Sequence, residues 1–161
     1  MLGVPHTSNW DFILMLAIVW RCKLHVRWLG KASLFKGPGG PIMRALGGIP
    51  VERSAAHGLT DKLIADLRSK PGQALVITPE GTRSAGEYWK SGFYRIAELA
   101  QMPVLLGFVD RATMTTGLGP VLELSGDVRA DMDRIREFYR GKVGIRPGQE
   151  IEPRLRAEDS A

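Results

Sequence analysis

The pattern of hydrophobic and polar positions along the chain predicts helices that alternate with strands. Apolar residues recur at helical spacing in three segments, at residues 59–69, 90–101 and 131–142. Apolar runs typical of strands lie at residues 25–30, 74–78, 103–109 and 120–125. Shorter extended pieces are expected at residues 1–4 and 49–51, the second at a sheet edge or in a loop because it contains a proline. This alternation predicts an α/β fold.

The most hydrophobic segment, Phe12–Trp20, is too short to cross a membrane. It has nine residues, whereas a spanning helix needs about 20. We expect a helix that begins near Ser8 or Asn9, which are residue types that cap helices, and ends near Arg21. Its apolar residues nearly surround it, which indicates a helix in the core or one that contacts a membrane surface.

The 161 residues fit one domain, and the excess positive charge lies in its first part. We expect a mixed β-sheet flanked by helices over residues 1–151 and a polar tail that frays over residues 152–161. Residues 1–60 hold seven Lys and Arg against two acids, and the remaining 101 residues hold 15 of each. This balance is compatible with an anionic partner, such as a phosphate ligand or an acidic lipid surface, and equally with a solvated basic face.

His6 and Asp11 are candidates for a general base and its partner. They lie at either side of the start of the predicted helix, so the chain can fold back and bring the two side chains together. Histidine can take a proton from an attacking hydroxyl near neutral pH, and a carboxylate on its other ring nitrogen stabilises the imidazolium. Taken alone, a chance histidine followed by an aspartate that complements the helix dipole is a serious alternative.

Two loops that contain arginine are candidates for binding phosphate. GGIPVER ends a Gly-rich turn at Arg53, whose guanidinium suits bidentate contact with phosphate. TPEGTRS follows a predicted buried strand and contains Arg83, and backbone N–H groups in such a loop can form an anion-binding nest. Each loop also has a simpler interpretation, in which the arginine pairs with a neighbouring glutamate or with solvent.

Four blocks together resemble the glycerolipid acyltransferase family, which includes the lysophosphatidate acyltransferases. Like this chain, members of that family have four blocks in this order: H-x4-D, a Gly-rich block that ends in Arg, P-E-G-T-R-S, and a hydrophobic block with proline. In this chain the blocks fall at His6–Asp11, Gly47–Arg53, Pro79–Ser84 and Met102–Val104. The order of four blocks is far more specific than any one of them.

The resemblance implies an O-acyltransferase in which His6 is the general base and Asp11 its partner. It implies that the acceptor's phosphate is bound by Arg53, Glu80, Gly81, Thr82 and Arg83, and we add Lys31 as a further cation. The acyl donor would be acyl-CoA or acyl carrier protein, and no cofactor or metal is implied. Direct attack on the thioester is expected, because the chain has no G-x-S-x-G motif for a serine acyl-enzyme.

The expected acceptor is a lysophospholipid of the 1-acylglycerol-3-phosphate type, which would place the enzyme in phospholipid biosynthesis. Pro50 and Glu52 stand where the family more often has an aromatic or aliphatic residue and Asp. Another lyso-lipid, a glycolipid or an amine therefore stays open as acceptor, as does a non-catalytic module that binds lipid or phosphate. We expect a cytoplasmic protein in peripheral contact with the anionic inner face of the membrane, without a nucleic-acid partner.

Overall fold

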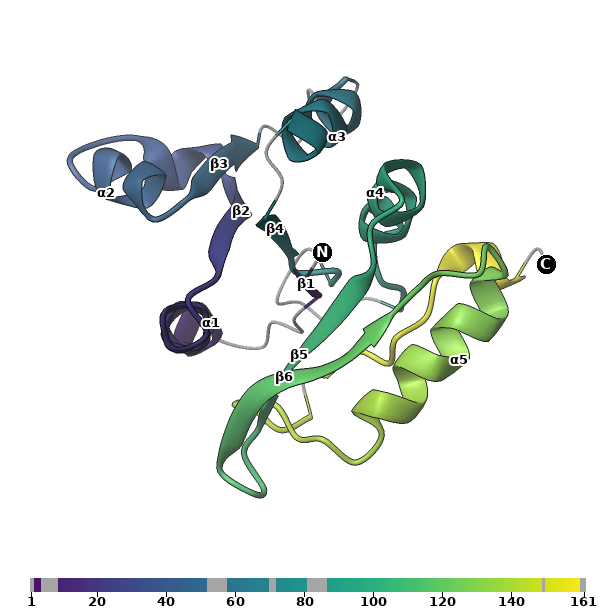
Figure 1. Cartoon of the computed structure of the whole chain (residues 1–161). Coiled ribbons are helices and arrows are strands. Elements are labelled where there is room, and N and C mark those ends of the chain that lie inside the picture. Colours follow the sequence, from purple (N-terminus) through teal and green to yellow (C-terminus); the bar gives the residue numbers. More distant parts are fainter. Residues whose placement is uncertain are drawn as a thin grey trace.

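The structure is a computed structural model that describes residues 2–3, 9–51, 58–69, 72–80, 87–148 and 150–159. Its strands are β1 (Leu2–Gly3), β2 (His25–Lys31), β3 (Gly48–Val51), β4 (Gln73–Ile77), β5 (Val104–Asp110) and β6 (Thr115–Leu122). Its helices are α1 (Asn9–Arg21), α2 (Gly40–Ala45), α3 (Leu59–Ser69), α4 (Gly92–Ala100) and α5 (Val128–Tyr139), with short 3-10 helices η1 (Ala32–Phe35) and η3 (Arg156–Asp159). Strands and helices alternate along most of the chain, which confirms the predicted α/β class (Figure 1).

The strands form one mixed sheet in the order β3-β2-β4-β1-β5-β6. Every pairing from β3 to β5 is parallel, and only β6 runs antiparallel to β5. The segment with Pro50 is therefore an edge strand, where the missing N–H costs no ladder hydrogen bond. Because the parallel strands point the same way, the loops that follow their carboxyl ends gather at one edge of the sheet.

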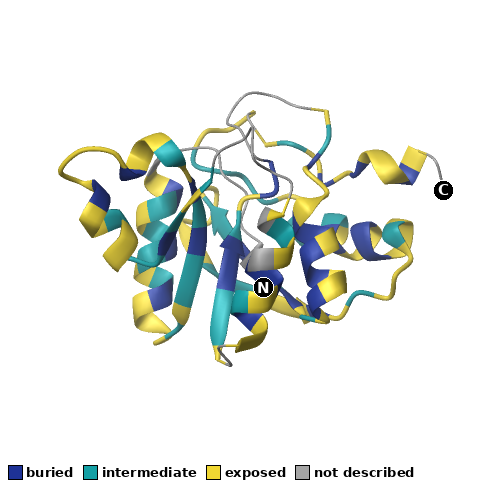
Figure 2. Cartoon of the chain, turned by 90° about the horizontal axis from the view of Figure 1, so that it is seen from above, coloured by how far each residue is buried: buried dark blue, intermediate teal, exposed yellow. Residues whose placement is uncertain are grey.

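Helices cover both faces of the sheet, and neighbouring residues of one strand serve the two sides. Leu75 of β4 packs in the core with α3, α4 and α5, whereas Val76 beside it packs in the core with α1. This division follows from the period of two in a strand. Figure 1 shows α1 on one side of the sheet and α3, α4 and α5 on the other, and Figure 2 shows the buried residues gathered between these layers.

The apolar helix α1 is only partly covered by the sheet. Met15 and Val19 are buried against it, while Trp10, Ile13 and Trp20 are exposed by 64%, 52% and 76%. The three exposed residues recur at helical spacing and therefore share one face. Within the described residues no helix combines the length and the hydropathy needed to cross a membrane.

Two glycines set the path of the chain into β3. Gly47 has a φ of +85°, and its backbone N–H donates to the carbonyl of Arg44 at the end of α2. A Cβ on Gly48 would lie 2.6 Å from the ring of Phe35, closer than packed atoms allow. The Gly-Gly pair thus lets β3 turn tightly out of α2 and lie against Phe35.

Two elements begin at different residues from those predicted, and local contacts explain the shifts. Helix α5 starts at Val128 because the Asp127 carboxylate accepts the N–H of Ala130 at 3.1 Å, a helix N-cap. Strand β6 starts at Thr115. The glycines of this stretch interrupt the alternation of hydrophobic and polar residues by which a strand is predicted. The strand is formed by antiparallel pairing with β5 from Asp110 back to Val104.

The C-terminal segment is packed against the domain, although its polar composition predicts fraying. Residues 156–159 form η3, and Leu155 and Glu158 are 1% and 7% exposed. Glu158 pairs with Arg136 of α5 at 2.7 Å and accepts the N–H of Leu155 at 2.6 Å. These contacts join residues 152–159 to α5.

Candidate active site

The predicted site residues His6, Arg53 and Glu80 each follow the carboxyl end of a parallel strand. Strand β1 ends three residues before His6, β3 ends two before Arg53, and β4 ends three before Glu80. His6, Arg53, Gly81, Thr82 and Arg83 lie outside the described residues. Asp11, Lys31 and Glu80 lie within them, and they locate the first and third blocks in the fold.

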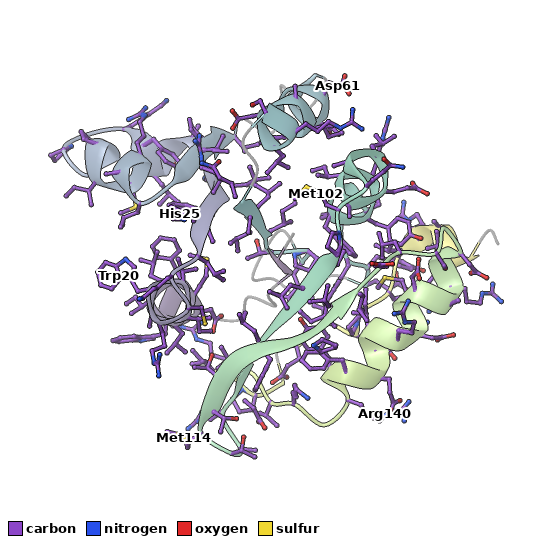
Figure 3. All side chains as sticks on the ribbon, in the orientation of Figure 1. Trp20, His25, Asp61, Met102, Met114 and Arg140 are labelled. Atoms are coloured by element: carbon purple, nitrogen blue, oxygen red, sulfur yellow. The ribbon has the colours of Figure 1, made fainter. Side chains whose placement is uncertain are left out.

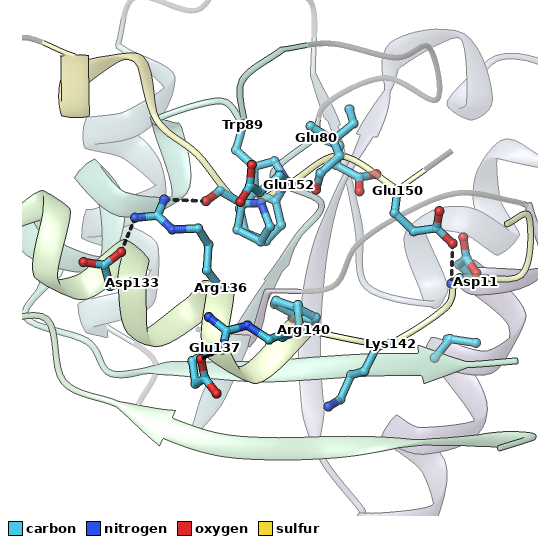
Figure 4. A pocket seen from close by; sticks show the side chains of 15 residues that line it. Asp11, Glu80, Trp89, Asp133, Arg136, Glu137, Arg140, Lys142, Glu150 and Glu152 are labelled. Atoms are coloured by element: carbon cyan, nitrogen blue, oxygen red, sulfur yellow. Dashed lines mark hydrogen bonds and ion pairs between the residues drawn. The ribbon is translucent and has the colours of Figure 1, made fainter. Parts of the chain in front are cut away.

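Asp11 and Glu80 line the same cavity. Both side chains are 3% exposed, and the cavity has a volume of about 520 Å³. Asp11 comes from the first turn of α1, and Glu80 follows β4, so their meeting depends on the sheet rather than on sequence proximity. The structure therefore joins two predicted site residues from separate blocks (Figure 4).

The rest of the cavity wall comes from Trp89, which precedes α4, from the end of β5, from α5 and from the segment that follows α5. A volume of this size is typical of small-molecule sites. The described residues that line it, besides Asp11 and Glu80, are Trp89, Val109, Asp133, Arg136, Glu137, Tyr139, Arg140, Lys142, Gly144, Glu150, Ile151, Glu152 and Pro153.

Two ion pairs on α5 contribute to this wall. Arg136 contacts Asp133 at 2.6 Å, and Arg140 contacts Glu137 at 2.8 Å. Their i,i+3 spacing is that of ordinary support on a surface helix. Asp133, Glu137 and Arg140 are 67%, 66% and 76% exposed, so both pairs line the cavity at its solvent-exposed rim (Figure 4). Arg136 also donates to the carbonyl of Pro153 at 2.9 Å, which holds the C-terminal segment over the cavity.

Trp89, five residues after the third block, forms hydrogen bonds with the same C-terminal segment. Its backbone N–H donates to the carbonyl of Arg154 at 2.7 Å, and its indole N–H donates to the carbonyl of Ile151 at 3.3 Å. The N–H of Lys90 donates to the carbonyl of Pro79 at 2.7 Å. These bonds fix Pro79 and the segment that begins at Trp89, on either side of residues 81–86, which lie outside the described residues.

Tyr139 supplies a neutral hydroxyl group beside Glu80. Its hydroxyl donates to the carbonyl of Gly107 at 2.8 Å. Burial, and then the negative charge of Glu80, raises the pKa of Tyr139 above its ordinary value of 10. The phenol therefore stays protonated at physiological pH and acts as a hydrogen-bond donor to β5.

Lys31 lies at the same edge of the sheet but outside this cavity. It is the exposed last residue of β2 and pairs with Val51, two residues before Arg53. It is not among the described residues that line the cavity. The structure thus places Lys31 beside the second block rather than beside Glu80.

Sequence reasoning did not find the cavity wall that α5 and residues 142–153 build. Their charged residues have the spacing of a solvent-exposed helix and loop, so no local signal marks them as part of a site. Within the described residues, no group of three or more His, Cys, Asp and Glu side chains could hold a metal ion.

A model of the acyltransferase family matches residues 4–105, well over half of the chain. The protein therefore belongs to the glycerolipid acyltransferase family, and it is an enzyme of the O-acyltransferase type. A comparison with curated proteins returns no significant match. The matched range spans the positions of all four blocks and ends before β6, α5 and the C-terminal segment.

Proposed function

We propose that the enzyme moves a fatty acyl group from acyl-CoA or acyl carrier protein to a hydroxyl of a lysophospholipid-type acceptor. The observation that supports this proposal is the meeting of Asp11 and Glu80 in one cavity of 520 Å³. A carboxylate of the first block and one of the third block lie where the carboxyl ends of the parallel strands converge. That edge is where ligands bind in open α/β sheets.

In the proposed reaction His6 takes the proton of the acceptor hydroxyl while the oxygen attacks the thioester carbonyl. Asp11, buried in the first turn of α1, holds the imidazole and stabilises its charged form. Backbone N–H groups near Gly81 would stabilise the oxyanion of the tetrahedral intermediate. The intermediate then collapses to the new ester and a thiolate, and His6 returns its proton to the departing sulfur.

The acceptor's phosphate would be held by Arg53 and Arg83, with Lys31 as a further cation. Lys31 and Val51 are neighbours on β2 and β3, so Lys31 lies beside the end of the second block. Guanidinium groups bind phosphate with two parallel hydrogen bonds. Holding the phosphate in this way would fix the hydroxyl near the base, which lowers the entropy cost of the reaction.

Replacing His6 tests the proposal directly. His6→Ala should lower the turnover number by about a hundredfold to ten-thousandfold, the usual contribution of a general base. His25→Ala is a matched control, because His25 is exposed and lies at the amino end of β2, away from the carboxyl ends of the strands where the cavity lies. Thiol release from acyl-CoA in the presence of a lysophospholipid measures turnover, and circular dichroism checks the fold. Near-normal turnover of a folded His6→Ala protein would contradict the proposed mechanism.

We also propose peripheral attachment to the inner face of the cytoplasmic membrane. The exposed apolar face of α1 presents Trp10 and Trp20, and the exposed cations Arg21 and Lys23 follow directly. Amphipathic aromatic side chains beside cations are typical of helices that lie on anionic lipid. Such attachment would bring the cavity to lipid acceptors.

A further inference from the structure

Residues 12–51 have several cations and no acid, and we call this part of the chain the basic lobe. It comprises most of α1 together with β2, η1, α2 and β3. Over these 40 positions it holds six Lys and Arg residues and neither Asp nor Glu, whereas residues 52–161 hold 16 of each sign. The cations are Arg21, Lys23, Arg27, Lys31, Lys36 and Arg44, all exposed except the half-buried Arg27. Because no carboxylate of the lobe neutralises them, the lobe attracts anionic partners.

The basic lobe also holds a large share of the exposed apolar side chains. Eight large hydrophobic residues are exposed among the described residues, and four of them lie in this quarter of the chain. Ile13 and Trp20 belong to α1, whereas Leu34 and Ile42 belong to η1 and α2 and are 53% and 60% exposed. Apolar side chains gathered among cations fit an anionic bilayer, in which the cations meet the headgroups and the apolar groups reach the acyl boundary.

The segment η1–α2 exposes Leu34 and Ile42 while the residues that follow them anchor it. Phe35, which follows Leu34, is 5% exposed, and Met43, which follows Ile42, packs against the same small core. Met15 of α1 belongs to this core as well. The segment therefore packs beside α1 with one apolar residue of each pair and leaves the other exposed.

Aromatic contacts hold η1–α2 and α1 in a fixed relative position. The ring centres of Phe12 and Trp28 are 4.7 Å apart, and those of Trp28 and Phe35 are 5.7 Å apart. The Arg44 guanidinium lies 5.6 Å from the centre of the Phe35 ring and donates to the Phe35 carbonyl at 3.4 Å. Figure 1 shows α1 and α2 on the same side of the molecule, away from α5. A flat surface that meets α1 can therefore also meet η1–α2.

We propose that η1–α2 is a second membrane contact, which inserts Leu34 and Ile42 into an anionic bilayer beside the exposed face of α1. The inference rests on the proposed peripheral attachment and adds a second point, which fixes the orientation of the protein on the surface. Lys31 ends β2 directly before η1. Lipid headgroups at this contact thus lie beside Lys31, one of the cations assigned to the acceptor's phosphate.

An environment-sensitive fluorophore tests where the protein meets the bilayer. A nitrobenzoxadiazole group is attached to one cysteine, introduced as Leu34→Cys, Ile13→Cys or Leu99→Cys in a Cys22→Ser background, because Cys22 is exposed. Leu99 is the control, since it is 45% exposed on α4, which packs on the other face of the sheet. With vesicles that contain phosphatidylglycerol at low salt, we expect a blue shift and brighter emission for Leu34→Cys and Ile13→Cys, and no change for Leu99→Cys.

Vesicle partitioning tests the contribution of charge to the same contact. Lys36→Gln should lower the partition coefficient by about fivefold, the effect of one cation near an anionic surface. Leu34→Ser should lower it by a similar factor or more, because an apolar side chain is no longer buried in the bilayer. Arg95→Gln is the matched control, because Arg95 is exposed on α4 and loses the same charge. Vesicles of phosphatidylcholine alone, which have the apolar interior without the net charge, should bind the wild type weakly.

A spectral shift in Ile13→Cys without one in Leu34→Cys would overturn the inference and leave attachment through α1 intact. Equal losses of partitioning in Lys36→Gln and Arg95→Gln would also overturn it, since the position of the charge would then not matter. Absence of any shift would contradict both the second contact and the peripheral attachment. Acyl transfer to a monomeric lysophospholipid without vesicles tests the proposed reaction separately, so failure of the membrane contact is distinguishable from failure of the acyltransferase.

Discussion

The indole N–H of Trp89 donates a hydrogen bond to the backbone carbonyl of Ile151, 3.3 Å away. This bond joins the segment that follows the third block to a residue that lies 62 positions later in the chain. Both residues line the cavity that contains Asp11 and Glu80. The wall of the cavity therefore depends on a contact between the family-matched part of the chain and the part beyond it.

Trp89→Phe should weaken acceptor binding more than donor binding. The ring would keep its packing against Phe93 and Tyr139, while the hydrogen bond, worth about 1 kcal/mol, would be lost. We expect a several-fold rise in the KM of the acceptor with little change in the KM of the acyl donor. Trp20→Phe, on the exposed face of α1, is the control. A larger effect on the donor would show that Trp89 serves the other substrate.

Arg83→Ala should impair binding of a phosphate-bearing acceptor. Loss of a charge-assisted hydrogen bond costs about 1.5–3 kcal/mol, so the KM of the acceptor should rise by roughly tenfold to a hundredfold. Arg53→Ala should act in the same direction. Steady-state kinetics with a phosphate-free lyso-lipid supply the comparison. An equal loss with that lipid would count against a phosphate role for the arginine.

Asp131→Ala should destabilise the fold strongly. Asp131 is 2% exposed and accepts hydrogen bonds from the Tyr94 hydroxyl at 2.8 Å and from the N–H and hydroxyl of Ser125 at 2.9 and 3.0 Å. Its removal leaves the buried Tyr94 hydroxyl and the Ser125 groups without their acceptor, at a cost of about 2–4 kcal/mol. Asp133→Ala, two residues away and 67% exposed, should cost less than about 1 kcal/mol. Urea unfolding measures both, and similar losses would refute a special role for Asp131.

Acid should weaken the turn that joins β5 to β6. The hydroxyl of Thr113 and the backbone N–H groups of Val143 and Ala112 donate to Asp110 and lower the pKa of its carboxyl below the ordinary 3.8. Because the pKa is lower in the folded state, the stabilisation is complete above the unfolded value and is lost as pH falls toward the folded one.

Replacing Asp110 should therefore reduce the acid sensitivity of the protein. The urea midpoint of the wild type should fall as the pH drops below the ordinary carboxyl pKa of 3.8, and Asp110→Asn should flatten this fall. The exposed Glu123, replaced by Gln, is the control. An unchanged slope in Asp110→Asn would show that this carboxyl does not couple folding to pH.

Binding to vesicles should depend on the exposed face of α1. We expect the protein to sediment with vesicles that contain anionic phosphatidylglycerol at low salt and to be released as salt rises, because Arg21 and Lys23 act through screened charges. Trp20→Ser should weaken binding several-fold. Met114→Ser is the matched control, since Met114 is 85% exposed in the turn between β5 and β6, away from Trp20 (Figure 3). No sedimentation at low salt would remove the proposal of peripheral attachment.

Local patterns predicted the elements whose apolar residues have a clear period. The predicted helix over residues 59–69 matches α3, and the helix expected from Asn9 to Arg21 matches α1. The start of β6 was missed because Thr115–Gly119 acquires strand structure only by pairing with β5. The i,i+3 spacing of Asp131 to Arg134 is typical of a surface acid, and it gives no sign of the contacts of Asp131 with the buried Tyr94 and with Ser125.

The sequence by itself determined the α/β class and the four blocks that mark the family, because hydrophobic period and motif chemistry are local properties of the chain. Only the tertiary structure decided that Asp11 and Glu80 share one cavity, since the parallel sheet brings together loops that are distant in sequence. It also decided that α5 and residues 142–153 close that cavity. Charged pairs on a surface helix look the same in sequence whether or not a cavity lies beside them, and packing alone settles whether one does.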